Sequence, residues 1–232
     1  GSGEADIIKA KVKLKKDASD DIHILVAAVD MGQGPKTTLR KVVSNIMEVP
    51  MKKVHYPNPD TLHVPDSGPT VASRTAMIVG GLCARAAEKL KKVYVPGKAD
   101  TVYETYVQPK EMTWDEDTMQ GDAYPAYSWG VNIVEVEVDK ETYQIDIKKM
   151  TSVYDIGKAL DERIIEGQIH GGQAQGLGYG YLEVMNHKEG RLQQTTMTDY
   201  IIPTAMDTPP MESSIINNPY ALGPYGAKGA GE

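Results

Sequence analysis

The last ten residues of the chain combine flexible glycines with a terminal carboxylate. They read Gly-Pro-Tyr-Gly-Ala-Lys-Gly-Ala-Gly-Glu, from residue 223 to Glu232. Glycine adopts positive φ at little steric cost and lets a backbone approach a ligand closely. Such a loop can deliver the Glu232 carboxylate into a buried pocket. The structural alternative is an unpacked terminus that carries these residues by chance.

Glutamine amides between glycines are the second chemical feature. Gln33 lies in a Met-Gly-Gln-Gly sequence, directly after the apolar segment at residues 23–29. Three further glutamines, Gln175 among them, occur in the glycine-rich stretch at residues 167–176. A glutamine side chain offers two donors and an acceptor without a charge, and it therefore suits a polar heterocycle or an oxo group. Taken singly, a Gly-Gln-Gly sequence is usually only a turn.

A turn rich in hydroxyl groups precedes a helix that we expect to continue to about residue 91. Residues 66–73 read Asp-Ser-Gly-Pro-Thr-Val-Ala-Ser, and Ser73 is predicted to cap the helix. The free N–H groups at the start of a helix can bind an anion. Arg74 follows; its planar guanidinium could pair with a phosphate, or it could be an exposed helix residue.

The composition excludes several classes of protein. The formal net charge of -7 argues against a nucleic-acid-binding surface. No run reaches the ~18 apolar residues of a membrane span, and no signal-peptide pattern is present, so we expect a cytoplasmic protein. The one cysteine, Cys83, excludes a disulfide framework and a four-cysteine cluster within this sequence. The histidines have no metal-site spacing, so we expect no metal ligands. The lysines between residues 9 and 16 are expected on the solvent face of a strand.

The hydrophobic periodicity predicts an α/β (α+β) protein with mixed sheets and packed helices. We expect strands at residues 8–16, 23–29, 53–56, 131–138, 143–149 and 192–202, and helices at residues 37–47, 73–91 and from Asp161 onward. Residues 203–218 are expected to form a long loop. The many glycines of the third helix suggest close backbone approach to another element or to a ligand. A length of 232 residues suits one domain, 1–232, or two lobes, 1–96 and 97–232.

In this order, the segments resemble the C-terminal half of the molybdopterin-binding subunit of molybdenum hydroxylases, the xanthine dehydrogenase and aldehyde oxidase family. The resemblance extends from about residue 9 to the end of the chain. It rests on residues 30–34, 65–75, 127–138, 155–157, 167–176, 200–204 and 226–232. The chain departs from the family pattern at Ala230, where valine is usual, at Tyr154, where histidine is common, and at Asp161-Glu162, where Asn-Pro is common.

The resemblance implies a role for each matched residue. Gln33, beside Gly32, would hydrogen-bond the oxo ligand of the molybdenum centre, and Gln175 would contact the pterin. The loop that holds the pterin and its phosphate would consist of Ala72, Ser73, Arg74 and Thr75. Glu232 would be the general base in the oxidation of a heterocycle or an aldehyde, with water as the oxygen source.

The resemblance also implies a molybdenum cofactor, as molybdopterin alone or as a dinucleotide, and several partners. These are the N-terminal half of the molybdenum subunit, iron–sulfur and flavin (FAD) subunits, and a small-molecule substrate; neither nucleic acid nor membrane is expected. The sequence would then be a fragment or a naturally split subunit, inactive alone. Two alternatives remain: a non-catalytic interaction module that keeps the fold without the cofactor, and a nucleotide-binding domain that uses residues 167–180. That stretch lacks the strand–GxGxxG–helix context.

Overall fold

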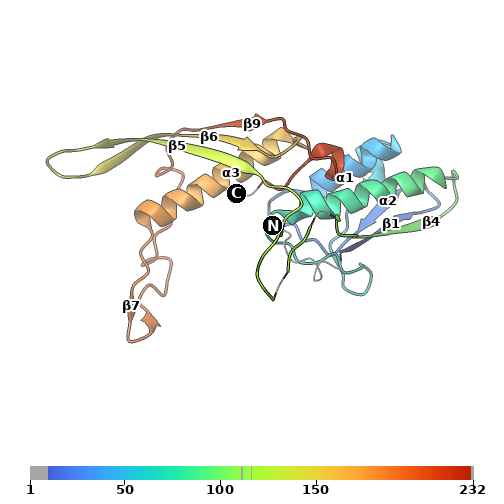
Figure 1. Ribbon diagram of the computed structural model, residues 1–232, viewed down its shortest axis with the longest axis horizontal. Helices are drawn as coiled ribbons and strands as arrows, with labels where there is room; N and C mark the ends of the chain where they lie inside the picture. The colour runs from blue at the N-terminus through green and yellow to red at the C-terminus, as the bar shows by residue number, and fades with distance from the viewer. Residues whose placement is uncertain (1–9, 111, 116, 231–232) are drawn as a thin grey trace. The chain divides into compact units, whose positions relative to one another are not determined.

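A computed structural model describes residues 10–110, 112–115 and 117–230 of the chain. It confirms the expected class, with helices packed on mixed sheets (Figure 1). The helices and strands are β1 (Lys11–Lys16), β2 (Ile22–Leu25), α1 (Pro35–Met47), β3 (Val54–His55), α2 (Gly80–Lys92), β4 (Asp100–Thr105), β5 (Trp129–Val138), β6 (Ile145–Asp155), α3 (Glu162–Leu177), β7 (His187–Lys188), β8 (Arg191–Leu192) and β9 (Met211–Ile216). Short 3-10 or π turns lie at Met51–Lys53, Thr75–Val79, Gly178–Leu182 and Pro224–Gly226.

The chain forms two compact units, and each is discontinuous in sequence. Unit 1 consists of Gly1–Trp129, Asp155–Glu162 and Ile216–Gly231, and unit 2 of Gly130–Tyr154 and Arg163–Ile215. This division differs from the expected lobes 1–96 and 97–232. The physical reason is that β4 pairs with β1 along its whole length, which carries the first sheet beyond residue 97.

Unit 1 is built on a four-stranded sheet of order β3-β2-β1-β4. β1 pairs antiparallel with β2 and β4, whereas β2 and β3 run parallel. α1 and α2 pack against each other, and α2 lies against β1 and β4 (Figure 1). The inward residues of β1, such as Val12 and Leu14, are fully buried in the core between this sheet and the helices.

The start of α1 is fixed by a glycine and a proline. Gly34 caps the helix with φ 78°, a left-handed conformation that glycine adopts easily, and Pro35 fills the first position, where its missing N–H is not needed. Four apolar residues at helical spacing are buried against the core: Leu39, Val42, Val43 and Met47. The predicted helix at 37–47 is therefore confirmed, with two more residues at its start.

One lysine of the expected solvent face is buried. Lys16 shares the inward face of β1 with Val12 and Leu14, because alternate residues of a strand point the same way, and it is 0% exposed. Its ammonium group pairs with Asp20 and lies 4.6 Å from the centroid of the Tyr94 ring, so the charge has two partners. The prediction was therefore wrong for Lys16.

Unit 2 contains a three-stranded sheet of order β5-β6-β9, a two-stranded sheet of β7 and β8, and the helix α3. The predicted hairpin of β5 and β6 is confirmed. Its turn is closed by Asp139, whose N–H donates to Gln144 O at 2.9 Å. The Asp139 carboxylate accepts the N–H groups of Glu141 and Thr142 at 2.8 and 2.7 Å.

Two elements of unit 2 differ from the sequence prediction. The expected strand at residues 192–202 was wrong, since β8 ends at Leu192 and the next residues form turns. The expected loop at residues 203–218 contains the strand β9. The β9 sequence, Met-Glu-Ser-Ser-Ile-Ile, has little apolar alternation, and the strand exists because it pairs with β6.

Candidate functional site

The turn that carries Gln33 is stabilised by its own side chains. The Gln33 amide donates from Nε2 to Val29 O at 2.9 Å and accepts from Met31 N at 2.7 Å. The Asp30 carboxylate accepts the Gly32 N–H at 2.9 Å, and Gly32 has φ 115°. Gln33 is half-buried, and the contacts among the described residues leave its second amide N–H available as a donor.

This turn lies next to the loop of residues 67–75. The Val29 N–H, one residue before the turn, donates to Thr70 Oγ1 at 3.0 Å. Two residues earlier, the Ala27 N–H donates to Ser67 Oγ at 2.9 Å, and Ser67 is fully buried. The chain after β2 therefore places Gln33 beside the loop that was predicted to bind the cofactor.

The loop itself is strained at Ala72 and Ser73. Both residues have φ 52°, and a left-handed conformation costs a non-glycine residue roughly 1–2 kcal/mol. Strain of this kind persists where the surroundings fix it, and it often occurs at ligand sites. Ser73 does not cap a helix as expected, because the helical turn begins at Thr75 and Arg74 precedes it without a side-chain cap. That prediction was wrong.

Arg74 supports the loop from inside. Its side chain is buried, with 4% exposure of the residue, and Nη1 donates to Ser67 O at 3.0 Å and Pro69 O at 2.7 Å. An added Cβ on Gly68, which has φ 74°, would lie 2.8 Å from Nη1. The exposed position considered for Arg74 was therefore wrong. Two loop carbonyls bind Nη1.

The C-terminal loop packs against this strained loop. An added Cβ on Gly229 would lie 2.7 Å from Ser73 O, so a glycine is needed for the approach. The Ser128 hydroxyl donates to Gly229 O. Three of the four predicted segments therefore lie together in unit 1. Glu232 itself lies outside the described residues.

A buried carboxylate anchors the C-terminal loop. Asp155 accepts from Lys228 Nζ at 2.8 Å, from Asn218 Nδ2 at 2.8 Å and from the Gly157 N–H at 3.0 Å. Burial works to raise the pKa of Asp155, but the hydrogen bonds from Lys228, Gly157 and Asn218 outweigh it and hold the pKa below its ordinary value. The group is therefore an ionised partner for Lys228 at neutral pH.

The fourth predicted segment lies on α3, in unit 2. One face of this helix is buried and repeats every four residues: Ile169, Gln173 and Leu177. The Gln173 amide donates to Ser152 Oγ, a residue of β6. Gln173 therefore packs α3 onto its sheet. Its spacing from Ile169 and Leu177 is the sequence signal that distinguishes Gln173 from Gln175.

Gln175 lies on the opposite face of α3. It is exposed and shares this face with Gly167 and Gly171, eight and four residues earlier. Among the described residues, no atom lies within 4 Å of a Cβ added to either glycine. The close approach expected at these glycines is therefore not made within the described chain, and the face is open to another group.

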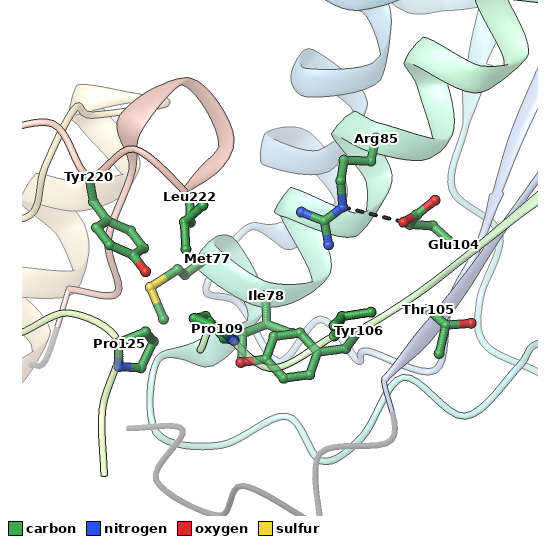
Figure 2. Close-up of a pocket in the computed structure, with 11 residues that line it drawn as sticks. Met77, Ile78, Arg85, Glu104, Thr105, Tyr106, Pro109, Pro125, Tyr220 and Leu222 are labelled. Carbon is green, nitrogen blue, oxygen red and sulfur yellow. Dashed lines mark hydrogen bonds and ion pairs between the residues drawn. The ribbon is translucent and has the colours of Figure 1, made fainter. Parts of the chain in front are cut away.

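A separate cavity of about 230 Å³ opens in unit 1 beside α2. Figure 2 shows its apolar wall, which includes Met77, Ile78 and Leu222, and the contact of Arg85 with Glu104 (3.4 Å) at its polar end. The lining includes neither Gln33 nor any residue from 72 to 75, so the cavity is distinct from the predicted cofactor site.

The described residues contain neither a cluster of metal-binding side chains nor a helix of membrane-spanning character. No group of three His, Cys, Asp or Glu side chains in this part of the chain is arranged to hold a metal ion. No helix there combines the length and apolar character needed to cross a membrane.

Comparison with known proteins identifies one domain family. The family described as the molybdopterin cofactor-binding domain matches residues 2–105 and 92–209. The large subunit of nicotine 6-hydroxylase from Paenarthrobacter nicotinovorans is 27% identical, with 99% of this chain and 33% of that protein covered. Aldehyde oxidoreductase from Megalodesulfovibrio gigas is 29% identical, with 98% and 26% covered.

Solved structures give the same result. Aldehyde oxidoreductase from Desulfovibrio gigas superposes with a TM-score of 0.81 at 26% identity, over 96% of this chain and 26% of that one. The enzyme from Desulfovibrio desulfuricans superposes with a TM-score of 0.82 at 23% identity, which shows the fold. The chain spans about a third or less of the length of these curated relatives.

Proposed function

The chain belongs to the molybdopterin cofactor-binding domain family, and from this premise we propose that it forms part of the catalytic subunit of a molybdenum hydroxylase. The substrate would be a heterocycle or an aldehyde, oxidised with water as the oxygen source. One observation carries the proposal: the Gln33 turn, the strained loop at Ala72 and Ser73, and the C-terminal loop meet within unit 1.

Each unit offers side chains that fit a pterin cofactor. The donors are neutral: the Gln33 amide and the hydroxyls of Ser73 and Thr75 in unit 1, and the Gln175 amide in unit 2. A pterin is a polar heterocycle, and neutral donors and acceptors can bind it without adding charge. The open glycine face beside Gln175 would let a planar group approach the backbone. When bound, the cofactor would supply the redox and Lewis-acid chemistry of the hydroxylation, as molybdopterin alone or as a dinucleotide.

The side chains of this chain would orient the cofactor and move one proton. Gln33 would donate its second amide N–H to the molybdenum centre, and Gln175 would hydrogen-bond the pterin. The hydroxyls of Ser73 and Thr75 would bind the phosphate, while Arg74 holds the loop in shape. A carboxylate oxygen of Glu232 would accept the proton from the oxygen nucleophile that attacks the substrate carbon.

The enzyme purified with its native partners tests this function. We expect stoichiometric molybdenum and pterin by elemental and fluorescence analysis, together with oxidation of heterocycles or aldehydes. Iron and FAD are expected on the partner subunits. A preparation that lacks both molybdenum and pterin would favour the non-catalytic interaction module instead.

Replacing Gln33 by alanine should lower activity in the assembled enzyme. If the loss leaves a buried partner without its donor, the cost is about 1–3 kcal/mol, or roughly 5- to 150-fold in kcat/KM. Gln193→Ala is a matched control, because the Gln193 amide also donates to a nearby backbone oxygen, Arg191 O at 3.0 Å, but far from the site in sequence. Equal kcat/KM values for Gln33→Ala and the wild type would contradict the role of Gln33.

We propose that the N-terminal half of the molybdenum subunit covers β5. All ten residues of β5 are exposed. Within the described chain, this strand pairs only with β6, so its other edge has no partner there. Apolar side chains occur on both faces, with Val131 and Ile133 on one and Val134 and Val136 on the other. A long apolar edge strand is a risk for aggregation, so such a strand is normally covered.

Amide hydrogen exchange in the native enzyme tests whether β5 is covered. We expect the amides of residues 130–138 to exchange slowly, because the backbone edge and both faces would be protected by the remainder of the subunit. The amide of Lys140, in the exposed β5–β6 turn, is the internal control and should exchange quickly. Rapid exchange of alternate amides along β5 would show that its outer edge remains open to solvent.

A further inference from the structure

Backbone pairing reinforces the buried contact of Asp155 with Lys228. The Lys228 N–H donates to Ile156 O at 2.9 Å, and the Lys158 N–H donates to Gly226 O at 2.9 Å. Gly157 and Ala227 form an antiparallel bridge between these bonds. The residues that follow β6 therefore hold the C-terminal loop in one register by both backbone and side-chain contacts.

The ion pair is buried on both sides. The Lys228 and Asp155 side chains are 9% and 7% exposed, and their charged atoms lie 2.8 Å apart. A buried pair contributes little net stability compared with an apolar pair of similar size, because both charges lose their hydration. What it does provide is a specific geometry, since Lys228 has to reach the carboxylate that Asn218 and Gly157 orient.

The residue after Lys228 transmits this geometry to the site. Gly229 packs against Ser73 and accepts a hydrogen bond from the Ser128 hydroxyl. Glu232 follows Gly229 by three positions in the sequence, and three residue steps span at most about 11 Å. An anchor at Lys228 and Gly229 therefore limits the volume in which the Glu232 carboxylate can move.

We propose that Asp155 and Lys228 are positioning residues, which clamp the C-terminal loop against the strained loop at Ala72 and Ser73. The clamp would hold the base in place for proton transfer and would keep Ser73 in its left-handed conformation. The identity of the base, Glu232, rests on the proposed function. The clamp rests on contacts within unit 1.

The test uses three variants of the assembled enzyme: Asp155→Asn, Lys228→Met and the double variant. Loss of the clamp should lower kcat by about 10- to 100-fold, the order expected when a reacting group is displaced by about 1 Å. KM and the molybdenum and pterin contents should change little. Amide exchange in residues 226–230 should accelerate in all three variants. Lys149→Met is the control, because Lys149 pairs with Glu212 at the same 2.8 Å but on the surface.

The double variant separates positioning from stability. Each single variant leaves one buried charge unpaired, whereas the double variant removes both charges and should recover part of the thermal stability. Under the proposal, kcat stays low in the double variant although its melting temperature rises. A double variant with the kcat and the 226–230 exchange of the wild type would overturn the clamp.

Two further measurements distinguish a failure of the clamp from misfolding of the variants and from a wrong assignment of the base. If the variants do not fold, the wild-type enzyme decides: slow exchange of the Lys158 and Lys228 amides supports the clamp, and fast exchange overturns it. Glu232→Gln, measured in parallel, reports on the base alone. If that variant keeps its turnover, the assignment of the base fails, while the exchange data still decide whether the loop is clamped.

Discussion

Glu232→Gln is expected to lower the turnover of the assembled enzyme by at least about 100-fold, the lower end of what general base catalysis contributes. The substitution keeps the size of the side chain and removes the basic carboxylate. The molybdenum and pterin contents should stay unchanged, because Gln33, Gln175 and the loop of residues 72–75 are the groups proposed to bind the cofactor. Steady-state kinetics measures the turnover, and elemental analysis of the same preparation measures the molybdenum content.

The pH profile gives a second readout for Glu232. In the wild type, kcat/KM should fall at acid pH as the base becomes protonated, and this limb should disappear in the glutamine variant. Glu141→Gln is the control, since Glu141 is exposed in the β5–β6 turn and should leave both quantities unchanged. Near-normal turnover of Glu232→Gln with a full complement of molybdenum would exclude Glu232 as the base.

Local patterns predicted the elements that have strong hydrophobic periodicity. α1 and the β5–β6 hairpin follow from residues that are near one another in sequence: a buried stripe with Pro35 at its start, and a turn closed by Asp139. β9 was missed because pairing with β6 forms it, and β6 ends more than fifty residues earlier. A pattern limited to one segment carries no information about such a partner.

The candidate site, like the fold, could be predicted only in part from the sequence. Sequence chemistry and the family resemblance singled out Gln33, the loop of residues 72–75 and the C-terminal loop. They did not reveal that Arg74 points into its own loop or that Asp155 meets Lys228, 73 residues later. Both contacts depend on burial and on the tertiary path of the chain. A charged residue gives no sign in the sequence of which partner it will meet.

Gly157→Ala should destabilise the C-terminal loop far more than a matched glycine substitution elsewhere in unit 1. Gly157 has φ 71°, and an added Cβ would lie 2.2 Å from Gly226 O and 3.0 Å from Lys228 N. Gly97 also has φ 71°, but among the described residues no atom lies within 4 Å of its added Cβ. The two positions therefore share the backbone strain and differ in the steric contact.

The left-handed conformation alone costs alanine roughly 1–2 kcal/mol, and this applies to Gly97→Ala and Gly157→Ala alike. At Gly157 the methyl group also has to displace a backbone carbonyl, an overpacking that typically adds about 1–3 kcal/mol. Separation of the two segments would break the hydrogen bond from the Lys228 N–H to Ile156 O. We therefore expect Gly157→Ala, but not Gly97→Ala, to accelerate amide exchange at Lys158 and Lys228 and to reduce turnover. Similar exchange and turnover in the two variants would mean that the close approach of residues 157 and 226 does not hold the loop.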